Sequence, residues 1–582
     1  MLQGHAMTGD ILSRVSHNTD ETEFYTPMPP GYRRGHHRYV VVVGTVMSGL
    51  GKGIFASSLA KLLQDKGLKV APIKLEGYYN IDSGTLNPYR HGEVFVLDDG
   101  MECDMDLGTY ERLLDQDLSS ANFCTNGQIF SSVLRKEREG GYLGRDVQTI
   151  PHVTGEVKLR LRELAVRSDA DVVFVEVGGT VGDYENSVYL EACRELAYEE
   201  GEGAVIFVAL TYVLEPRTLG EQKSKAAQLG IKRLMEMGIM PSIIACRASN
   251  PVNERVRQKI SMYTNVPMRR VVSMHDLDSV YLVPEALRDA GIDREVLTLL
   301  DLHDRVDQRH EDRARQKWRW FVDRIGRSRA RIKVAITGKY TALRDAYASI
   351  IKAVEHCGVH LEAEIRLEWI DTTSIDDADV PGLLSDCQGI IVPGGFGVRG
   401  VEGKIRCIRY ARENRLPFLG LCLGFQAAVI EYARNVCGLA GANSTEFDPH
   451  CPVPVIDVLP EQKKIEGLGG TMRLGGRDVL LKPGTLAARL FNDARQVRLR
   501  FRHRYEVDPR YIETLERHGL IFSGTAPGHP IMQVLELPQD VHPFFLGTQA
   551  HPELTSRPLR PSPMFMGFCQ AALERVRPMA AP

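Results

Sequence analysis

Tyr39-Val-Val-Val-Val-Gly44, followed at once by Thr-Val-Met-Ser-Gly-Leu-Gly-Lys-Gly53, is the stretch that decides the fold of this 582-residue chain. The continuous apolar run predicts a strand buried on both faces, and the glycine-rich segment predicts a tight turn. Apolar residues then recur at helical spacing over 54–66 and stop at Gly67, where a second strand, 69–75, begins. Strand, helix and strand in this order predict a parallel sheet with helices on its faces.

The same alternation continues along the chain in two series. Buried strands are predicted at 172–177, 204–210 and 242–246, and a new series starts at 332 and continues at 389–392 and 417–421. We therefore predict an α/β protein of two domains, each a mainly parallel sheet flanked by helices. The predicted segments are a disordered or loosely docked extension at 1–37, a first domain at 38–303, a charged helical linker at 304–330 and a second domain at 331–582.

Composition excludes several classes of protein. The chain has 72 Lys+Arg and 75 Asp+Glu, a net charge of -3, which argues against a protein whose main partner is nucleic acid. The longest apolar stretches, such as 203–214, are shorter than the roughly 20 residues of a membrane span. Eleven Cys without a CxxC pair, and an N-terminus without an apolar signal region, predict a cytoplasmic enzyme.

The glycine-rich segment predicts a phosphate site, because backbone N–H groups and a helix dipole meet there. The strict pattern GxxxxGK[ST] is broken twice, by Val46 in place of the first Gly and by Gly53 in place of the hydroxyl residue. A tight turn without a ligand is the alternative. We expect Lys52 to neutralise the transferred phosphoryl group. The predicted ATP-phosphate loop comprises Ser48, Gly49, Leu50, Gly51, Lys52 and Gly53.

Carboxylates for Mg²⁺ are found in two other segments. Asp104 and Asp106 lie in the segment MECDMDLGTYER, and Glu176 ends the predicted strand VVFVEV before Gly-Gly. The carboxyl end of a parallel strand is where an α/β sheet places its ligands. Each acid alone would more often be a helix cap or a surface residue, but together with the phosphate loop they favour a magnesium site.

The second domain contains a candidate nucleophile. Cys422 is centred in Gly420-Leu-Cys-Leu-Gly424 between a strand and a helix, the G-x-C-x-G form of a nucleophile elbow. Its base is expected to be His551, with Glu553 to orient the imidazole. The segment Val392-Pro-Gly-Gly-Phe-Gly397 has backbone N–H groups suited to an oxyanion hole. Without the elbow, Cys422 and His551 would be interpreted as packed core residues.

These motifs resemble two known families. PGGFG, CLGxQ and His-Pro-Glu are similar to class I glutamine amidotransferase domains, and the chain from about Tyr39 onward resembles the CTP synthase family. The matching segments include SGLGKG, HGEVFVLDDG, DLGTYER, KEREGGYLG, VEVGGTVGD, GEQKSK, PGGFGVRGVEGK, ANSTEFDP, GGTMRLG and RHRYEV.

For the second domain the resemblance implies glutamine hydrolysis. Cys422 would attack the carboxamide of glutamine with the help of His551 and Glu553. The oxyanion would be held by backbone N–H groups around Gly394, Gly395 and Leu423, and the amino-acid end of glutamine by Gln426, Glu446 and Arg504. Ammonia would then cross internally to the first domain.

For the first domain the resemblance implies that ATP phosphorylates O4 of UTP and that ammonia displaces the phosphate to give CTP. Lys52 and Lys74 would neutralise the phosphoryl group, Asp106 and Glu176 would hold Mg²⁺, and Arg247 would lie against adenine. The positions implied for UTP or feedback CTP are Ser48, Gln148, Asp183, Glu185, Lys223, Lys225, Gln228, Lys259 and Tyr263. The resemblance further implies a pyrimidine-biosynthesis ligase that is activated by GTP through the PGGFGVRGVEG region and forms homotetramers.

Two segments of the first domain depart from the family pattern. Where the family usually has Asp-Pro after Lys-Leu, this chain has Glu76-Gly77, and GExKTKPTQ appears here with Ser224, Ala226 and Ala227. Val43, Thr45 and Gly49 also differ from the usual residues. Neutral divergence is one explanation. The alternatives are a paralogue that amidates a different pyrimidine nucleotide or a related acceptor, and a non-catalytic structural homologue such as a filament subunit, against which the retained Lys52, Asp106, Glu176, Cys422 and His551 argue.

Overall fold

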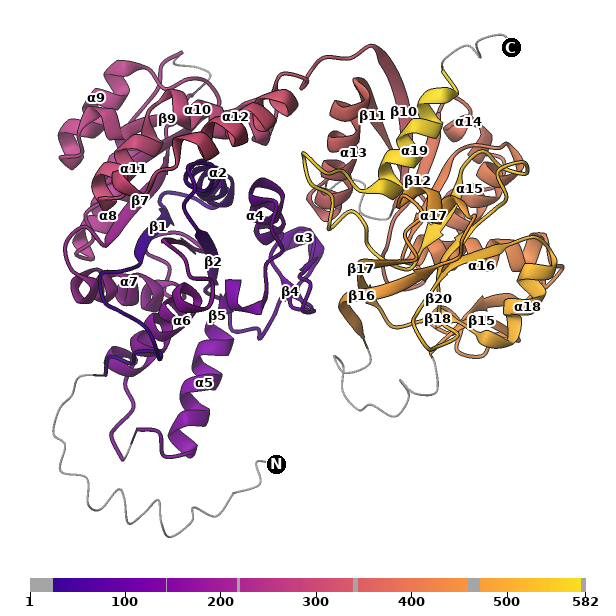
Figure 1. The fold of residues 1–582 in the computed structure, drawn as a ribbon, viewed down its shortest axis with the longest axis horizontal. Helices are drawn as coiled ribbons and strands as arrows, with labels where there is room; N and C mark the ends of the chain where they lie inside the picture. Colours follow the sequence, from indigo (N-terminus) through magenta and orange to yellow (C-terminus); the bar gives the residue numbers. More distant parts are fainter. Residues whose placement is uncertain (1–24, 143, 217–219, 339–343, 459–471, 577–582) are drawn as a thin grey trace. The chain divides into compact units, whose positions relative to one another are not determined.

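The computed structural model describes residues 25–142, 144–216, 220–338, 344–458 and 472–576. The chain divides into two compact units. The first unit comprises residues up to 85 together with 120–316, and the second comprises 86–119 together with 317–582 (Figure 1).

The first unit is built on a parallel sheet of seven strands in the order β5-β2-β6-β1-β7-β8-β9. Every pair in it is parallel, as the sequence predicts. The strands are β5 (Phe123–Thr125), β2 (Val70–Glu76), β6 (Val172–Val177), β1 (Arg38–Gly44), β7 (Val205–Tyr212), β8 (Ile243–Ala248) and β9 (Val271–His275).

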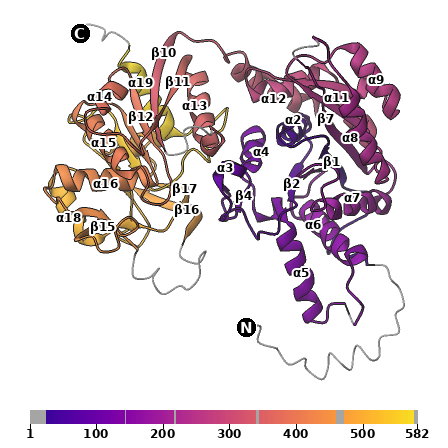
Figure 2. The ribbon, with the colours of Figure 1, turned by 180° about the vertical axis from the view of Figure 1, so that it is seen from behind.

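Helices cover both faces of this sheet, which explains the continuous apolar run of β1. Tyr39, Val41 and Val43 belong to one core together with side chains of α6 (Thr154–Arg167) and α7 (Ser187–Glu200). The intervening residues of β1 face the opposite way, toward the side of α2 (Lys52–Asp65). Figures 1 and 2 both show α2 on one side of the sheet and α6 with α7 on the other. The remaining helices of the unit include α5 (Asn126–Arg138), α8 (Lys225–Glu236), α9 (Glu254–Thr264), α10 (Val283–Asp289) and α11 (Ile292–Leu300).

The described part of the N-terminal extension, residues 25–37, packs on the first unit. The ring of Tyr25 lies 5.3 Å from that of Tyr142 and 5.4 Å from that of His152. Gly35 N donates to Glu200 Oε2 at 3.0 Å. The first 24 residues of the predicted extension lie outside the described residues.

The second unit contains a sheet of nine strands in the order β11-β10-β12-β13-β21-β20-β19-β16-β17. Its first five strands are parallel neighbours, and its last four run antiparallel to their neighbours, so the sheet is mixed. The strands are β11 (Ala363–Asp371), β10 (Ala330–Gly338), β12 (Gly389–Val392), β13 (Phe418–Leu421), β21 (Phe545–Thr548), β20 (Met532–Glu536), β19 (Ile521–Thr525), β16 (Arg473–Leu481) and β17 (Gln496–His503).

The nine-stranded sheet also separates two cores. One core includes side chains of α15 (Val401–Glu413) and α16 (Leu423–Asn435), and the other includes side chains of α13 (Ala348–Leu361) and α19 (Pro563–Glu574). The predicted linker contains α12 (Gln308–Val322), of which Trp318 and Phe321 are buried. A smaller sheet of β14 (Ala442–Ser444), β15 (Val453–Asp457) and β18 (Glu506–Val507) completes the unit.

Residues 86–119 belong to the second unit although they interrupt the sequence of the first. They contain β3 (Phe95–Val96), β4 (Glu102–Cys103) and α4 (Asp106–Leu114). Asp98 O accepts from Gly476 N at 2.7 Å, and the Asp98 carboxylate pairs with Arg498 at 2.8 Å. These contacts join segments almost 400 residues apart, so local sequence patterns could not reveal them. The predicted domain boundaries stay a prediction.

Candidate active sites

Cys422 occupies a strained turn between β13 and α16. Its φ of 50° and ψ of -102° are unusual for a residue with a side chain, and they point the thiol away from the strand that it ends. A Cβ added to Gly424 would lie 2.0 Å from Val392 O. Glycine at 424 is therefore required for the close approach of α16 to β12, and the turn has the geometry of a nucleophile elbow.

His551 and Glu553 stand beside this thiol. His551 Nδ1 lies 2.7 Å from Glu553 Oε1. A Cβ on Gly394 would lie 3.0 Å from His551 Cε1 and 3.4 Å from Cys422 Cβ, so the Gly394 backbone borders both residues. Burial lowers the pKa of His551, but the charges of Glu553 and Cys422 outweigh it and hold that pKa well above its usual value. The arrangement favours an imidazolium next to the thiol.

Sequence reasoning missed Gln549, which joins the nucleophile to the predicted glutamine site. Gln549 Nε2 donates to Cys422 Sγ at 3.5 Å, and its Oε1 accepts from Gln426 Nε2 at 3.0 Å. Gln426 also donates to Tyr505 O at 2.9 Å. The signal available in the sequence was the position of Gln549 two residues before His551.

The other predicted glutamine-binding residues lie on loops around the elbow. Glu446 Oε1 accepts from Gly397 N at 2.7 Å, which ties the PGGFG segment to the turn after β14. Arg504 follows β17 directly and precedes β18. Leu423 is the first residue of α16, so its backbone N–H has no partner within the helix.

In the first unit, the predicted phosphate loop connects β1 to α2. Gly49 and Gly51 have φ of 73° and 79°, and α2 begins at Lys52. Val46 has φ of 74°, a conformation that a β-branched residue rarely adopts. The loop therefore keeps a glycine-like backbone at the position where the strict pattern requires Gly. Lys52 Nζ donates to Gly179 O at 2.8 Å, which places its ammonium group at the end of β6.

Lys74, Glu76 and Glu176 form a buried charged cluster at the same sheet edge. Lys74 and Glu176 are register partners of β2 and β6, and Lys74 Nζ lies 2.7 Å from Glu176 Oε1 with side chains 5% and 1% exposed. Glu76 Oε1 is 3.4 Å from the same ammonium group. A Cβ on Gly178 would lie 2.7 Å from Glu76 Oε2, so the Glu76 carboxylate lies directly against that glycine. Sequence reasoning identified Lys74 and Glu176 but assigned no role to Glu76.

The residues predicted to contact the acceptor nucleotide are distributed over five segments, of which the phosphate loop contributes Ser48. Asp183 and Glu185 lie between β6 and α7, and Asp183 Oδ2 accepts from Thr180 N at 2.7 Å. Gln148 N donates to His152 Nδ1 at 3.1 Å. The others lie before or on α8, namely Lys223, Lys225 and Gln228, and one turn apart on α9, namely Lys259 and Tyr263.

The departures at positions 77 and 224 contact these predicted acceptor residues. A Cβ on Gly77 would lie 2.9 Å from Glu185 Cβ, so a larger residue would displace Glu185. Gln228 Nε2 donates to Ser224 Oγ at 3.0 Å. Near the predicted adenine position, Arg247 pairs with Asp276 and donates to Met274 O at 3.3 Å.

The predicted magnesium ligands belong to different units. Glu176 ends β6 in the first unit, and Asp106 begins α4 in the second. Within the described ranges, no group of three or more His, Cys, Asp or Glu is arranged to hold a metal ion. A site of two carboxylates completed by phosphate oxygens and water, as Mg²⁺ commonly has, stays a prediction.

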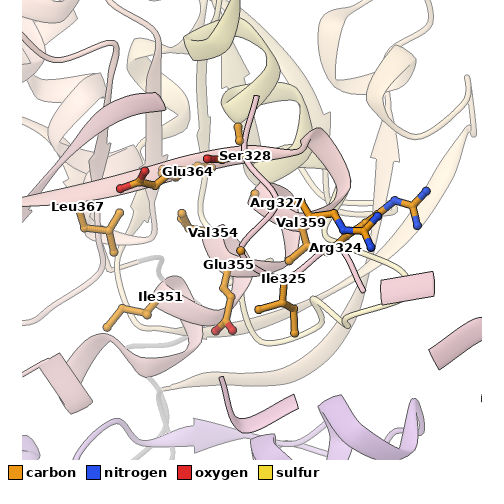
Figure 3. Close-up of a pocket in the computed structure, with 14 residues that line it drawn as sticks. Arg324, Ile325, Arg327, Ser328, Ile351, Val354, Glu355, Val359, Glu364 and Leu367 are labelled. Atoms are coloured by element: carbon orange, nitrogen blue, oxygen red, sulfur yellow. The ribbon is translucent and has the colours of Figure 1, made fainter. Parts of the chain in front are cut away.

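A cavity of about 420 Å³ lies in the second unit, apart from all of these residues. Its walls come from α13, β11 and residues 324–328. Figure 3 shows the guanidinium groups of Arg324 and Arg327 on the side opposite Ile351 and Leu367. None of the predicted site residues lines this cavity. In the part of the chain that the structure describes, no helix has the length and apolar character to span a membrane.

Comparison with known proteins identifies the family to which this chain belongs. The family model described as CTP synthase N-terminus matches residues 38–302, and that described as glutamine amidotransferase class-I matches 342–571. A CTP synthase of Thermus thermophilus is 48% identical over 541 residues, which are 92% of this chain and 97% of the relative. The chain belongs to the CTP synthase family. Its function is therefore glutamine-dependent CTP synthesis by an ATP-dependent ligase.

Other relatives agree with membership of the CTP synthase family. CTP synthases of Thermococcus gammatolerans and Pyrococcus furiosus are each 48% identical over 92% of this chain, which corresponds to 99% and 98% of their own lengths. The solved structure described as the Trypanosoma brucei CTPS glutaminase domain with bound acivicin is 35% identical, with a TM-score of 0.40. It covers 42% of this chain and 94% of its own.

The elbow generates a prediction for Gly424→Ala. The added methyl group would collide with Val392 O, and misplacement of the thiol by about 1 Å is expected to lower glutamine hydrolysis at least 10²-fold. Glutamate release by the purified variant measures this. The matched control is Gly382→Ala on α14 (Val380–Leu384), where an added Cβ meets open space. Equal activity of the two variants would contradict the elbow geometry.

The His551–Glu553 pair generates a second prediction, for Glu553→Gln. Because the Glu553 charge raises the pKa of His551, its removal lowers that pKa, and the imidazolium is lost at lower pH. The alkaline limb of kcat/KM for glutamine hydrolysis should move down by about one pH unit or more. Glu513→Gln, whose side chain is 83% exposed on α18 (Pro509–Arg517), is the control. An alkaline limb at the wild-type position in Glu553→Gln would refute this role of Glu553.

Proposed function

We propose that this enzyme uses the two centres for the two halves of UTP amination. The first unit activates O4 of UTP with ATP, and the second releases ammonia from glutamine. The observation that carries the proposal is that each unit holds its own cluster of reactive side chains. Lys52, Lys74 and Glu176 meet at one sheet edge, and Cys422 meets His551 at the other.

In the glutaminase reaction, Cys422 Sγ attacks the carboxamide carbon of glutamine. The oxyanion is held by backbone N–H groups at Gly394, Gly395 and Leu423. His551 then donates its proton to the leaving nitrogen, so that ammonia departs and a thioester remains. Water hydrolyses the thioester with His551 as the base, and glutamate leaves. Glu553 keeps the imidazole oriented throughout, as its 2.7 Å contact requires. Gln426, Glu446 and Arg504 hold the amino-acid end of glutamine, the last by a bidentate contact to its carboxylate.

In the synthetase reaction, the phosphate loop and two lysines hold ATP. Residues 48–53 offer backbone N–H groups to the phosphates at the start of α2. Lys52 exchanges its contact with Gly179 O for a phosphate oxygen. Lys74 neutralises the transferred group beside it, and Arg247 lies against the adenine.

Glu176 has the donor chemistry for Mg²⁺. Its carboxylate is buried, stands at the carboxyl end of a parallel strand, and is balanced by Lys74. We propose Glu176 and Asp106 as the protein ligands, with phosphate oxygens and water completing the coordination. When bound, Mg²⁺ supplies positive charge to the phosphates.

The acceptor is bound by Ser48, Gln148, the predicted residues between β6 and α7, and the predicted positions before and on α8 and on α9. Gly77 lies beside the predicted acceptor residues, and its lack of a side chain lets Glu185 approach β2 closely. The proposal further includes activation by GTP through residues 393–403 and assembly as a homotetramer. It also includes a cytoplasmic location without nucleic-acid or membrane partners.

The proposal is tested with purified protein, UTP, ATP and Mg²⁺, with glutamine or ammonium as the nitrogen source. We expect CTP from both sources. Lys52→Ala should lower ATP-dependent CTP formation from ammonium at least about 10²-fold, because it removes a cation from the transferred phosphoryl group. Formation of CTP and release of phosphate are the measurements.

Lys69→Ala is the matched control, since that lysine is 63% exposed and pairs only at the surface with Asp169 among the contacts described. Full activity of Lys52→Ala would contradict the phosphate site. Absence of CTP, together with ATP consumption and amination of another nucleotide, would contradict UTP as the acceptor.

A further inference from the structure

Glu111, a buried carboxylate of α4, has no role in the reaction described above. Of its motif, DLGTYER, only Asp106 belongs to the predicted magnesium site. Glu111 is fully buried, and its oxygens lie 2.7 and 3.0 Å from the Arg500 guanidinium and 2.8 Å from Arg557 Nη2. Both arginine side chains are 1% exposed. Glu111 is therefore the buried carboxylate that pairs with both guanidinium groups.

The two arginines contact the backbone on both sides of the catalytic histidine. Arg500 O accepts from His551 N at 2.8 Å. Arg557 Nη1 donates to Leu554 O at 2.9 Å, and Leu554 N donates to His551 O at 3.2 Å. The loop that holds His551 and Glu553 is thus fastened to β17 at its start and to the Arg557 side chain at its end.

We propose that Glu111 is a positioning residue of the glutaminase, which holds Arg500 and Arg557 so that the imidazole of His551 keeps its place beside the Cys422 thiol. The inference rests on the proposed glutaminase function. Paired, fully desolvated guanidinium and carboxylate groups have restricted geometry, whereas a loop without such partners moves more freely. Proton transfer between Cys422 and the substrate is sensitive to displacements of about 1 Å.

Asp117 provides a matched control within the same network. Its Oδ1 lies 2.9 Å from a guanidinium nitrogen of each arginine, but its side chain is 61% exposed. Ion pairs exposed to solvent contribute little, so the two arginines should keep their positions without Asp117.

The experiment compares Glu111→Gln with Asp117→Asn. Glutamine keeps the shape of Glu111 and removes its charge. We expect Glu111→Gln to lower kcat for glutamate release at least about tenfold, with KM for glutamine changed less than about threefold. Alkylation of Cys422 by iodoacetamide, which reports the thiolate, should slow in parallel. Asp117→Asn should stay within about twofold of the wild type in all three measurements.

CTP formation from ammonium distinguishes positioning from general damage. It bypasses the glutaminase, so Glu111→Gln should retain it if the inference is correct. An equal loss of both activities, or wild-type kcat for glutamate release, would overturn the inference. Failure of the wild type itself to form CTP would count against UTP as the acceptor and would leave the comparison of glutamate release intact.

A second variant covers a failure of Glu111→Gln to fold, since two buried guanidinium groups would then lack the buried carboxylate that they share. Arg557→Met keeps the Arg500–Glu111 pair and removes the tie to Leu554 O. Loss of glutamate release at least about tenfold, with ammonium-dependent CTP formation retained, would support the inference. Unchanged glutamate release in this variant would overturn it.

Discussion

Both active centres depend on the same constraint, a buried parallel strand that passes into a helix within a very short turn. Such a turn directs backbone N–H groups and one reactive side chain toward the carboxyl edge of the sheet. Such a turn requires backbone conformations that residues with a side chain rarely adopt. Gly49, Gly51 and even Val46 have positive φ in the first unit, as does Cys422 in the second. The strain is tolerated because helices cover the strands on both faces and hold them in place.

Buried charge is the second organising element of the molecule. Glu176 balances Lys74, Glu553 raises the pKa of His551, and Glu111 balances Arg500 and Arg557. Each carboxylate is strongly desolvated, so an unpaired partner would be costly. The carboxylates therefore fix where the cations and the imidazole stand, and the catalytic groups take their positions from them.

The strands and the two strand-to-helix turns were predictable because their signals are local. The run Tyr39–Gly44, the glycine spacing around Lys52 and the G-x-C-x-G pattern each contain their own structural reason. His551 and Glu553 were predictable only with the elbow already identified. The mixed character of the second sheet was harder to predict, because nothing in the local sequence distinguishes β20 or β16 from a parallel strand. Gln549 was missed because its partners, Cys422 and Gln426, are more than 100 residues away in the sequence, and Glu76 because its role depends on the buried Lys74–Glu176 pair that joins two strands.

The sequence by itself determined the α/β class, a candidate nucleophile, a candidate phosphate lysine, and the resemblance to the CTP synthase family. The two candidates follow from residues within about ten positions of each other, and the class and the resemblance follow from the order of such segments along the chain. Only the tertiary structure decided that 86–119 joins the second unit, that Gly77 accommodates Glu185, and that Glu111 holds the arginines around His551. The physical reason is that such contacts join segments up to several hundred residues apart, and buried ion pairs and close backbone approaches leave no periodic pattern along the chain.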